Sequence, residues 1–163
     1  MVVGDREPEV GDFPCLRYAE WVIKESMRIY PPAWGVGRRA LREFKVRDYS
    51  LPAGTNVLLM QWLTQHDPRF YPEPDGFNPD RWAGNAPDRE LPRFAYFPFG
   101  GGPRMCVGAS FAMVEATLLL AAITRQFRLT LVSNQHVEML PSVTLRPKNG
   151  IRMVLKKRDW NNF

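Results

Sequence analysis

The sequence predicts a mainly α-helical chain to which small β-sheets are attached. Two long stretches place apolar residues three and four positions apart, which is the spacing of one helix face. Several short apolar runs are bounded by glycine or proline turns and indicate strands. Eight of the fifteen prolines lie between Pro68 and Pro103, and this predicts an ordered but irregular coil in that part of the chain.

The first helix is predicted over residues 13–30, because its apolar spacing is helical and Pro31-Pro32 would end it. From residue 67 to residue 103 we expect turns, single helical turns and coil. We expect Asn149-Gly150 to turn the last two strands into a hairpin. The other predicted elements are a helix at 109–126 and strands at 44–46, 55–60, 127–132, 143–145 and 151–155.

Length, charge and cysteine content limit the possible classes of function. A chain of 163 residues is long enough for one domain with its own core. The chain has a net charge of +5, but its basic residues are scattered along the sequence rather than clustered, which argues against a nucleic-acid partner. The most apolar run, residues 107–123, contains a glutamate and predicts a buried helix rather than a membrane segment. Cys15 and Cys106 stand in unrelated contexts, which favours a reducing compartment over a disulfide framework.

The stretch FPFGGGPRMCVG, residues 97–108, places Cys106 directly before the second predicted helix. Free backbone N–H groups and the helix dipole at that position favour a thiolate over a thiol. Glycines at 100, 101, 102 and 108 leave space around the sulfur, so that a flat ligand can approach closely. A thiolate of this kind is one of the known proximal ligands of haem iron.

Two other interpretations of Cys106 compete with haem ligation. Zinc takes about four ligands, and the available Cys and His residues have spacings unlike those of zinc modules. These residues are Cys15, His66, Cys106 and His136. The other alternative is structural: Cys106 is then a small buried apolar residue that follows a tight turn.

Glu25 and Arg28 lie three positions apart on the first predicted helix, so they share a face and can pair. Most pairs of this kind are exposed and contribute little to stability. Here the helix is apolar and ends at Pro-Pro, which favours a buried pair. Arg81 in the segment Asn-Pro-Asp-Arg-Trp can supply a second arginine to the same carboxylate.

Together these stretches resemble the cytochrome P450 haem-thiolate family. FPFGGGPRMCVG matches the family's cysteine-ligand loop, Glu25-Ser-Met-Arg28 matches its Glu-x-x-Arg helix, and residues 77–82 match the segment with the second arginine. The resemblance covers residues 13–157 but only the C-terminal part of the family's fold. That part comprises the Glu-x-x-Arg helix, a proline-rich meander, the cysteine-ligand loop, the following helix and a terminal β-hairpin.

The resemblance implies a haem b cofactor (iron protoporphyrin IX) with Cys106 as the axial iron ligand. Phe99 would shield the sulfur, and Arg104 would pair with a haem propionate. Arg38 stands where the family often has a second propionate-binding arginine, and the neighbouring Arg39 is its rival. The positions expected to contact haem are Phe99, Gly100, Gly102, Arg104, Cys106, Gly108 and Arg38. The positions expected to form a structural network are Glu25, Arg28 and Arg81.

The implied activity is O2-dependent hydroxylation of a small organic substrate, with electrons from a ferredoxin- or flavodoxin/reductase-type donor protein. The sequence resembles cytoplasmic bacterial members, and the question of a membrane anchor in a missing N-terminal part stays open. The segment Gln65-His66-Asp67-Pro68 differs from the family's usual His-Arg-Asp-Pro, which we expect to affect packing more than chemistry.

The family's long distal helix and its Gly-x-Asp/Glu-Thr group have no counterpart in this sequence. We therefore expect residues 1–163 to be a single partial domain, the C-terminal haem-binding portion of a cytochrome P450. The alternative function is that of a catalytically inactive truncated fragment that at most binds haem or a partner.

Overall fold

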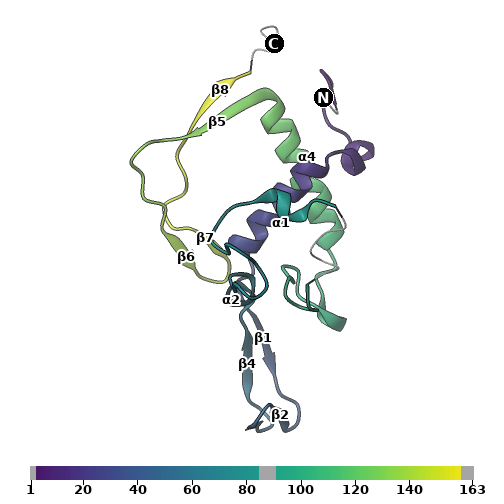
Figure 1. Ribbon diagram of the computed structural model, residues 1–163, viewed down its shortest axis with the longest axis vertical. Helices are drawn as coiled ribbons and strands as arrows, with labels where there is room; N and C mark the ends of the chain where they lie inside the picture. Colours follow the sequence, from purple (N-terminus) through teal and green to yellow (C-terminus); the bar gives the residue numbers. More distant parts are fainter. Residues whose placement is uncertain (1–2, 85–90, 159–163) are drawn as a thin grey trace.

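The computed structural model describes residues 3–84 and 91–158. Two longer helices cross near the centre, and the remaining elements are short (Figure 1). The helical elements are η1 (Val10–Cys15), α1 (Arg17–Ile29), α2 (Gln61–Gln65), η2 (Pro79–Trp82), η3 (Gly102–Arg104) and α4 (Ala109–Gln126), where η marks a 3₁₀ helix.

The strands of the described residues form antiparallel pairs. The first two pairs lie on an arm that extends away from the helices, and the other two pairs lie beside the helices (Figure 1). The pairs are β1 (Val36–Arg39) with β4 (Asn56–Leu59), β2 (Phe44–Val46) with β3 (Tyr49–Leu51), β5 (Phe127–Leu131) with β8 (Met153–Lys157), and β6 (Met139–Pro141) with β7 (Leu145–Pro147).

The helix predictions hold except at one end. α4 has the predicted bounds, whereas α1 begins at Arg17 rather than four residues earlier. The reason lies in the backbone before it: Pro14 belongs to a separate 3₁₀ turn, and Leu16 has a non-helical ψ of 38°. The predicted coil is confirmed for the described part of residues 67–103, which contains only single 3₁₀ turns, while residues 85–90 lie outside the described residues.

The predicted pairing of the last two strands is wrong. Asn149-Gly150 does form a turn, because Gly150 has a φ of +71° and its N–H lies 3.4 Å from the carbonyl oxygen of Pro147. However, β7 pairs with β6, and β8 pairs with β5. In the β5–β8 pair, Leu129 lies opposite Leu155. A long segment of the chain separates these two strands, and the sequence pattern did not predict that they pair. The terminal hairpin is β6–β7.

The centre of the protein is a polar cluster covered by aromatic rings. Glu25 and Arg28 on α1 have no exposed surface, and neither have Gln61 and Gln65 on α2. Tyr71 and Trp82 from the proline-rich coil, together with Ala95, cover this cluster. The coil therefore packs against α1 through polar and aromatic side chains rather than through aliphatic ones.

α4 is apolar around most of its circumference, yet only Thr117 of its residues is fully buried. Phe111, Leu119 and Ile123 are exposed on it. An all-round apolar helix is typical of a helix that is enclosed on all sides. Among the helices that the structure describes, none is long and apolar enough to cross a membrane.

Candidate functional site

Residues 97–108 form a tight loop that leads into α4 and contains Cys106. Gly100 and Gly102 have φ angles of +75° and +70°, a region that residues with side chains rarely adopt. The loop is closed by a hydrogen bond of 2.9 Å from the backbone N–H of Cys106 to the carbonyl oxygen of Phe99. Cys106 is a free, exposed cysteine, which contradicts its interpretation as a buried apolar residue.

The glycines of this loop serve different purposes. A Cβ atom on Gly101 would lie 2.4 Å from the ring of Phe94, so this glycine makes room for a side chain of the protein itself. That Gly101 also makes room for a ligand stays a prediction. A Cβ atom on Gly108 would lie 3.9 Å from Sγ of Cys106. A Cβ atom on Gly102 would have no described atom within 4 Å. Gly108 thus leaves space beside the sulfur, whereas Gly102 faces open space.

Apolar side chains surround Cys106 at the surface. Val107 is fully exposed, and Met105 and Phe111 are exposed by more than half. Phe99 is half-buried and lines a cavity of about 270 Å³ together with Met105. A thiol bordered in this way is suited to a large apolar group, since such a group would remove these side chains from water.

Arg38 on β1 lies near the glycines of the cysteine loop. It lines a cavity of about 590 Å³ whose lining also includes Gly100 and Gly101. Arg39 does not line this cavity, because successive side chains of a strand point to opposite faces. Arg104 is exposed on η3 and lies outside the cavity lining. The geometry thus separates Arg38 from Arg39, which the sequence alone did not do.

Glu25 and Arg28 form a bidentate ion pair in the centre of the protein. Nε and Nη2 of Arg28 donate to the two carboxylate oxygens of Glu25 over 3.0 and 2.9 Å. Nε of Arg81 lies 3.4 Å from Oε1 of the same carboxylate. Arg28 also donates to the carbonyl oxygens of Pro74 and Gly76 in the coil. The two arginines and the glutamate form one network that joins α1 to the proline-rich coil.

Two further donors to Glu25 were not predicted from the sequence. The indole N–H of Trp82 donates to Oε2 over 2.9 Å, and the backbone N–H of Asn78 donates to Oε1 over 3.1 Å. Burial raises the pKa of Glu25, but the hydrogen bonds from Arg28, Asn78 and Trp82 together outweigh it, so that the pKa lies below its usual value. The only sequence signal for Trp82 was its place next to Arg81 in a proline-flanked turn.

The network is connected to the cysteine loop through aromatic residues. The ring of Trp82 packs against that of Tyr96 at a centroid distance of 4.6 Å. The hydroxyl of Tyr96 donates to the carbonyl oxygen of Lys24 on α1 over 3.1 Å. Because Tyr96 directly precedes the loop of residues 97–108, α1 holds the entry to that loop.

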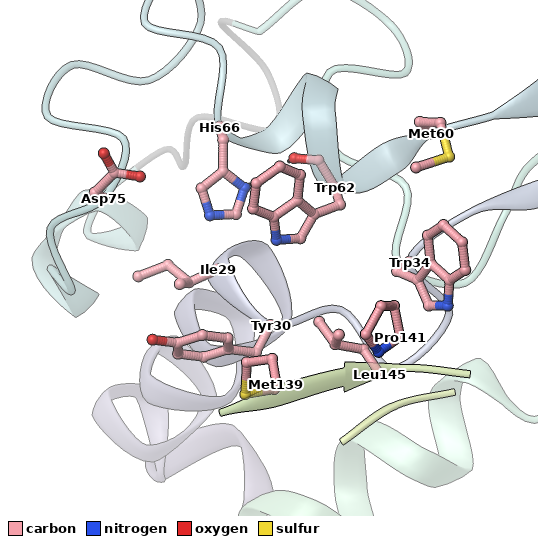
Figure 2. A pocket seen from close by; sticks show the side chains of 10 residues that line it. All are labelled: Ile29, Tyr30, Trp34, Met60, Trp62, His66, Asp75, Met139, Pro141 and Leu145. Atoms are coloured by element: carbon pink, nitrogen blue, oxygen red, sulfur yellow. Dashed lines mark hydrogen bonds between the residues drawn. The ribbon is translucent and has the colours of Figure 1, made fainter. Parts of the chain in front are cut away.

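Another cavity of about 530 Å³ lies between the end of α1, α2 and the β6–β7 hairpin (Figure 2). Its walls include Trp34 and Trp62, and the ring of His66 stacks on Trp62 with centroids 4.3 Å apart. Trp34 binds to the β6–β7 hairpin, because its indole N–H donates to the carbonyl oxygen of Ser142 over 2.8 Å. Among the described residues, no cysteine or arginine lines this cavity, so it offers neither a thiolate for haem iron nor a guanidinium group for carboxylates.

The donor groups around Cys106 fit a haem. They comprise one accessible thiol, an arginine on β1, an arginine on η3 and apolar side chains. A thiolate is a haem-iron ligand, and guanidinium groups pair with carboxylates such as the propionates. In residues 3–84 and 91–158, no three His, Cys, Asp or Glu side chains are grouped so that they could hold a metal ion by themselves.

Comparison with known proteins identifies the family of this chain. A sequence model of the family described as cytochrome P450 matches residues 1–154. Cyclooctatin synthase of Streptomyces melanosporofaciens is 37% identical over 159 residues, which are 96% of this chain and 34% of that protein. Cytochrome P450 4V2 of Homo sapiens is 37% identical over 158 residues, 95% of this chain and 30% of that protein. The chain spans about a third of the length of the curated relatives it matches.

Solved structures give the same result. The retinoic acid-bound cyanobacterial CYP120A1 matches with a TM-score of 0.87 at 31% identity, over 93% of this chain and 35% of that one. The heme domain of cytochrome P450DA matches with a TM-score of 0.87 at 27% identity, over 96% and 34% of the two chains. The resemblance and the fold class inferred from the sequence are confirmed, and the chain belongs to the cytochrome P450 family.

Proposed function

We propose that this chain is the haem-ligating part of a monooxygenase that uses O2 to hydroxylate a small organic substrate. The observation that carries the proposal is the free, exposed thiol of Cys106 at the end of a glycine-rich loop directly before α4. Membership of the cytochrome P450 family supports it, because the family implies a haem cofactor. A relative of 37% identity carries the name cyclooctat-9-en-7-ol 5-monooxygenase.

In this proposal the loop of residues 97–108 holds the axial ligand. The hydrogen bond from the N–H of Cys106 to the carbonyl oxygen of Phe99 fixes the backbone next to the sulfur. Gly108 leaves the sulfur accessible, because its missing Cβ would stand 3.9 Å away. A thiolate-ligated haem, when bound, supplies the activation of O2 that oxygen insertion requires. The contribution of the chain is to position the ligand and to shield it with Phe99.

Arg38 and Arg104 would bind the two propionates of haem. Arg38 lines the cavity that adjoins Gly100, and Arg104 is exposed on η3 within the same loop as Cys106. Two cations on different elements can orient a flat dianionic group, since each ion pair fixes one end of it. Arg39 is not assigned to this role.

The network of Glu25, Arg28 and Arg81 would keep the loop in place without touching haem. It joins α1 to the coil, and Tyr96 carries the connection to the loop entry. Its role in the reaction is therefore structural. A ferredoxin- or flavodoxin/reductase-type partner would deliver electrons to the whole protein. We propose that the whole protein is located in the cytoplasm of a bacterium.

A second candidate function is haem binding without turnover. The observation in its favour is the exposed apolar surface near the site, on Val107 and on Phe111 and Leu119 of α4. Exposed apolar surface of this kind favours association or loose packing. Water that reaches the iron would also make thiolate ligation labile. Under this second candidate the chain by itself binds haem weakly and hydroxylates nothing.

A reconstitution experiment separates the two candidates. The chain, or a longer protein that contains it, is loaded with haem and supplied with ferredoxin, ferredoxin reductase, NADPH and an alkoxycoumarin, whose hydroxylation at the alkoxy carbon releases a fluorescent phenol. Product from the wild type but not from Cys106→Ser supports the monooxygenase. A thiolate-type spectrum without product supports haem binding alone. Absence of both the spectrum and the product contradicts both candidates.

A further inference from the structure

The end of α1 lacks two of its regular hydrogen-bond donors. In an α-helix the carbonyl oxygen of residue i accepts from the N–H of residue i+4. The last such bond here runs from the N–H of Tyr30 to the carbonyl oxygen of Ser26 over 2.8 Å. The carbonyl oxygens of Met27 and Arg28 would need donors at positions 31 and 32. Both positions are prolines, which carry no N–H.

The side chain of Gln65 supplies donors to both of these carbonyl oxygens. Its Nε2 lies 3.0 Å from the carbonyl oxygen of Met27 and 2.9 Å from that of Arg28. A glutamine amide nitrogen has two N–H groups, so one residue can serve both acceptors. Gln65 is completely buried on α2, 37 positions away from Arg28 in the sequence. Water therefore has no access that would let it take over this task.

A third bond runs in the opposite direction. Nη1 of Arg28 donates to the backbone carbonyl oxygen of Gln65 over 2.9 Å. The same guanidinium holds Glu25 through its Nε and Nη2 atoms. Gln65 thus bonds to the backbone of Arg28 with its side chain and to the side chain of Arg28 with its backbone. Neither group can turn without breaking a bond that the other makes.

We propose that Gln65 is a positioning residue, whose amide group replaces the two donors removed by Pro31 and Pro32 and thereby fixes Arg28 and Glu25. This assignment gives a role to the first residue of the stretch Gln65-His66-Asp67-Pro68. Gln65 occupies the position where the family usually has histidine. Both side chains can donate from nitrogen, so the change keeps a donor. The inference rests on hydrogen bonds of the chain itself and does not depend on the proposed reaction.

Gln61 provides a matched control on the same helix. It lies one helical turn before Gln65 and is equally buried. Within the described residues, however, neither Oε1 nor Nε2 of Gln61 has a hydrogen-bond partner. Of the Gln65 side chain, only Oε1 lacks one. Methionine has nearly the shape of glutamine and no amide group, so the same substitution removes donors in use at one position and idle groups at the other.

The test is hydrogen exchange, followed by NMR, on the 163-residue chain without haem. The indole N–H of Trp82 reports on Glu25, to which it donates, and the backbone N–H of Tyr30 reports on the end of α1. The amides of β5 and β8 report on a distant part of the fold. Exchange rates are compared among the wild type, Gln65→Met, Gln65→His and Gln61→Met.

We expect Gln65→Met to accelerate exchange at Trp82 and Tyr30 about tenfold or more, since orphaned buried carbonyl groups destabilise this region locally. Exchange in β5 and β8 should stay within about twofold of the wild type. Gln61→Met should leave all sites within about threefold, and Gln65→His should restore exchange toward the wild-type rate because it keeps a donor.

Four results would overturn the assignment. Wild-type exchange in Gln65→Met would show that the amide bonds hold nothing in place. Equal acceleration in Gln61→Met, or acceleration that extends to β5 and β8, would reduce Gln65 to an ordinary packing residue. A Gln65→His chain as fast as Gln65→Met would show that donation is not the property that matters. Since no haem is present, each of these outcomes leaves the proposed monooxygenase function to be judged separately.

Discussion

The hydroxyl group of Tyr96 donates to the carbonyl oxygen of Lys24 over 3.1 Å. Tyr96 stands at the entry to the cysteine loop, and Lys24 directly precedes Glu25 on α1. The ring of Tyr96 also packs against Trp82, whose indole N–H donates to Glu25. The buried ion network and the loop that presents Cys106 are therefore one connected structure, and changes in one are expected to reach the other.

Tyr96→Phe tests this connection directly. The substitution keeps the ring against Trp82 and removes only the hydroxyl that bonds to Lys24. We expect the free energy of unfolding to fall by about 0.5–1.5 kcal/mol, the usual value of one hydrogen bond. Chemical denaturation measures it. Tyr49→Phe is the control, because Tyr49 is exposed on β3, and equal losses in both variants would contradict a specific role of the Tyr96 hydroxyl.

Arg28→Ala should be far more damaging than the loss of an exposed ion pair. It leaves the carboxylate of Glu25 buried with its main partner gone, which typically costs about 3–5 kcal/mol. Lys148→Ala breaks an exposed pair with Glu138 at 3.0 Å and should cost less than about 1 kcal/mol. Urea denaturation of both variants gives the comparison. Similar stabilities of the two variants would show that the network does not behave as a buried one.

Acid should weaken the fold through Glu25. Burial raises its pKa, but the hydrogen bonds from Arg28, Asn78 and Trp82 leave the folded-state pKa below the usual value near 4.5. The unfolded chain therefore binds a proton first, and the contribution of Glu25 is present above about pH 4.5 and is lost as the pH falls through the lower folded-state pKa.

Denaturation of the wild type and of Glu25→Gln, from neutral pH down to about pH 3, checks this effect. A hydrogen bond from Arg6 lowers the pKa of Asp12 to about 2, and Asp12 is present in both proteins, so its protonation affects both alike. The difference in the free energy of unfolding between the two proteins thus isolates Glu25. It should shrink as the pH falls, and a difference that stays constant over this range would rule out the assigned pKa direction.

Arg38 and Arg39 should differ in their effect on haem binding. Of these two arginines, Arg38 lines the cavity beside Gly100 and Arg39 does not. We therefore expect Arg38→Ala to weaken haem binding about tenfold and Arg39→Ala to leave it nearly unchanged. Titration of the chain with haem, followed by absorbance, gives both affinities. A larger loss in Arg39→Ala would assign the propionate contact to the neighbouring residue.

The longer elements with strong patterns were predictable from the sequence, whereas several of the short ones were not. α4 has apolar residues along its whole length, and its bounds match the prediction. β1, β3 and β6 were missed, because each has three or four residues and they form two-stranded pairs with little burial to impose a pattern. The pairing of β8 with β5 joins residues far apart in the chain, and a local turn such as Asn149-Gly150 contains no information about it.

The site was predictable where residues lie close together in the sequence. The spacing of Glu25 and Arg28 implies a pair on any helix, and the glycines around Cys106 imply a tight loop. Contacts that bridge distant segments had no such signal. Trp82 donates to Glu25 across 57 positions, and Gln65 bonds to Arg28 across 37. The prolines at 31 and 32 did imply missing donors, but only the fold shows which residue replaces them.

The most direct test of the account concerns the two cysteines. The chain, or a longer protein that contains it, is reconstituted with haem, reduced and exposed to CO, and its absorbance spectrum is recorded for the wild type, Cys106→Ser and Cys15→Ser. We predict the red-shifted band of a thiolate-ligated haem in the wild type and in Cys15→Ser, and its absence in Cys106→Ser. Loss of the band in both variants, or its survival in Cys106→Ser, would contradict the assignment of Cys106 as the iron ligand.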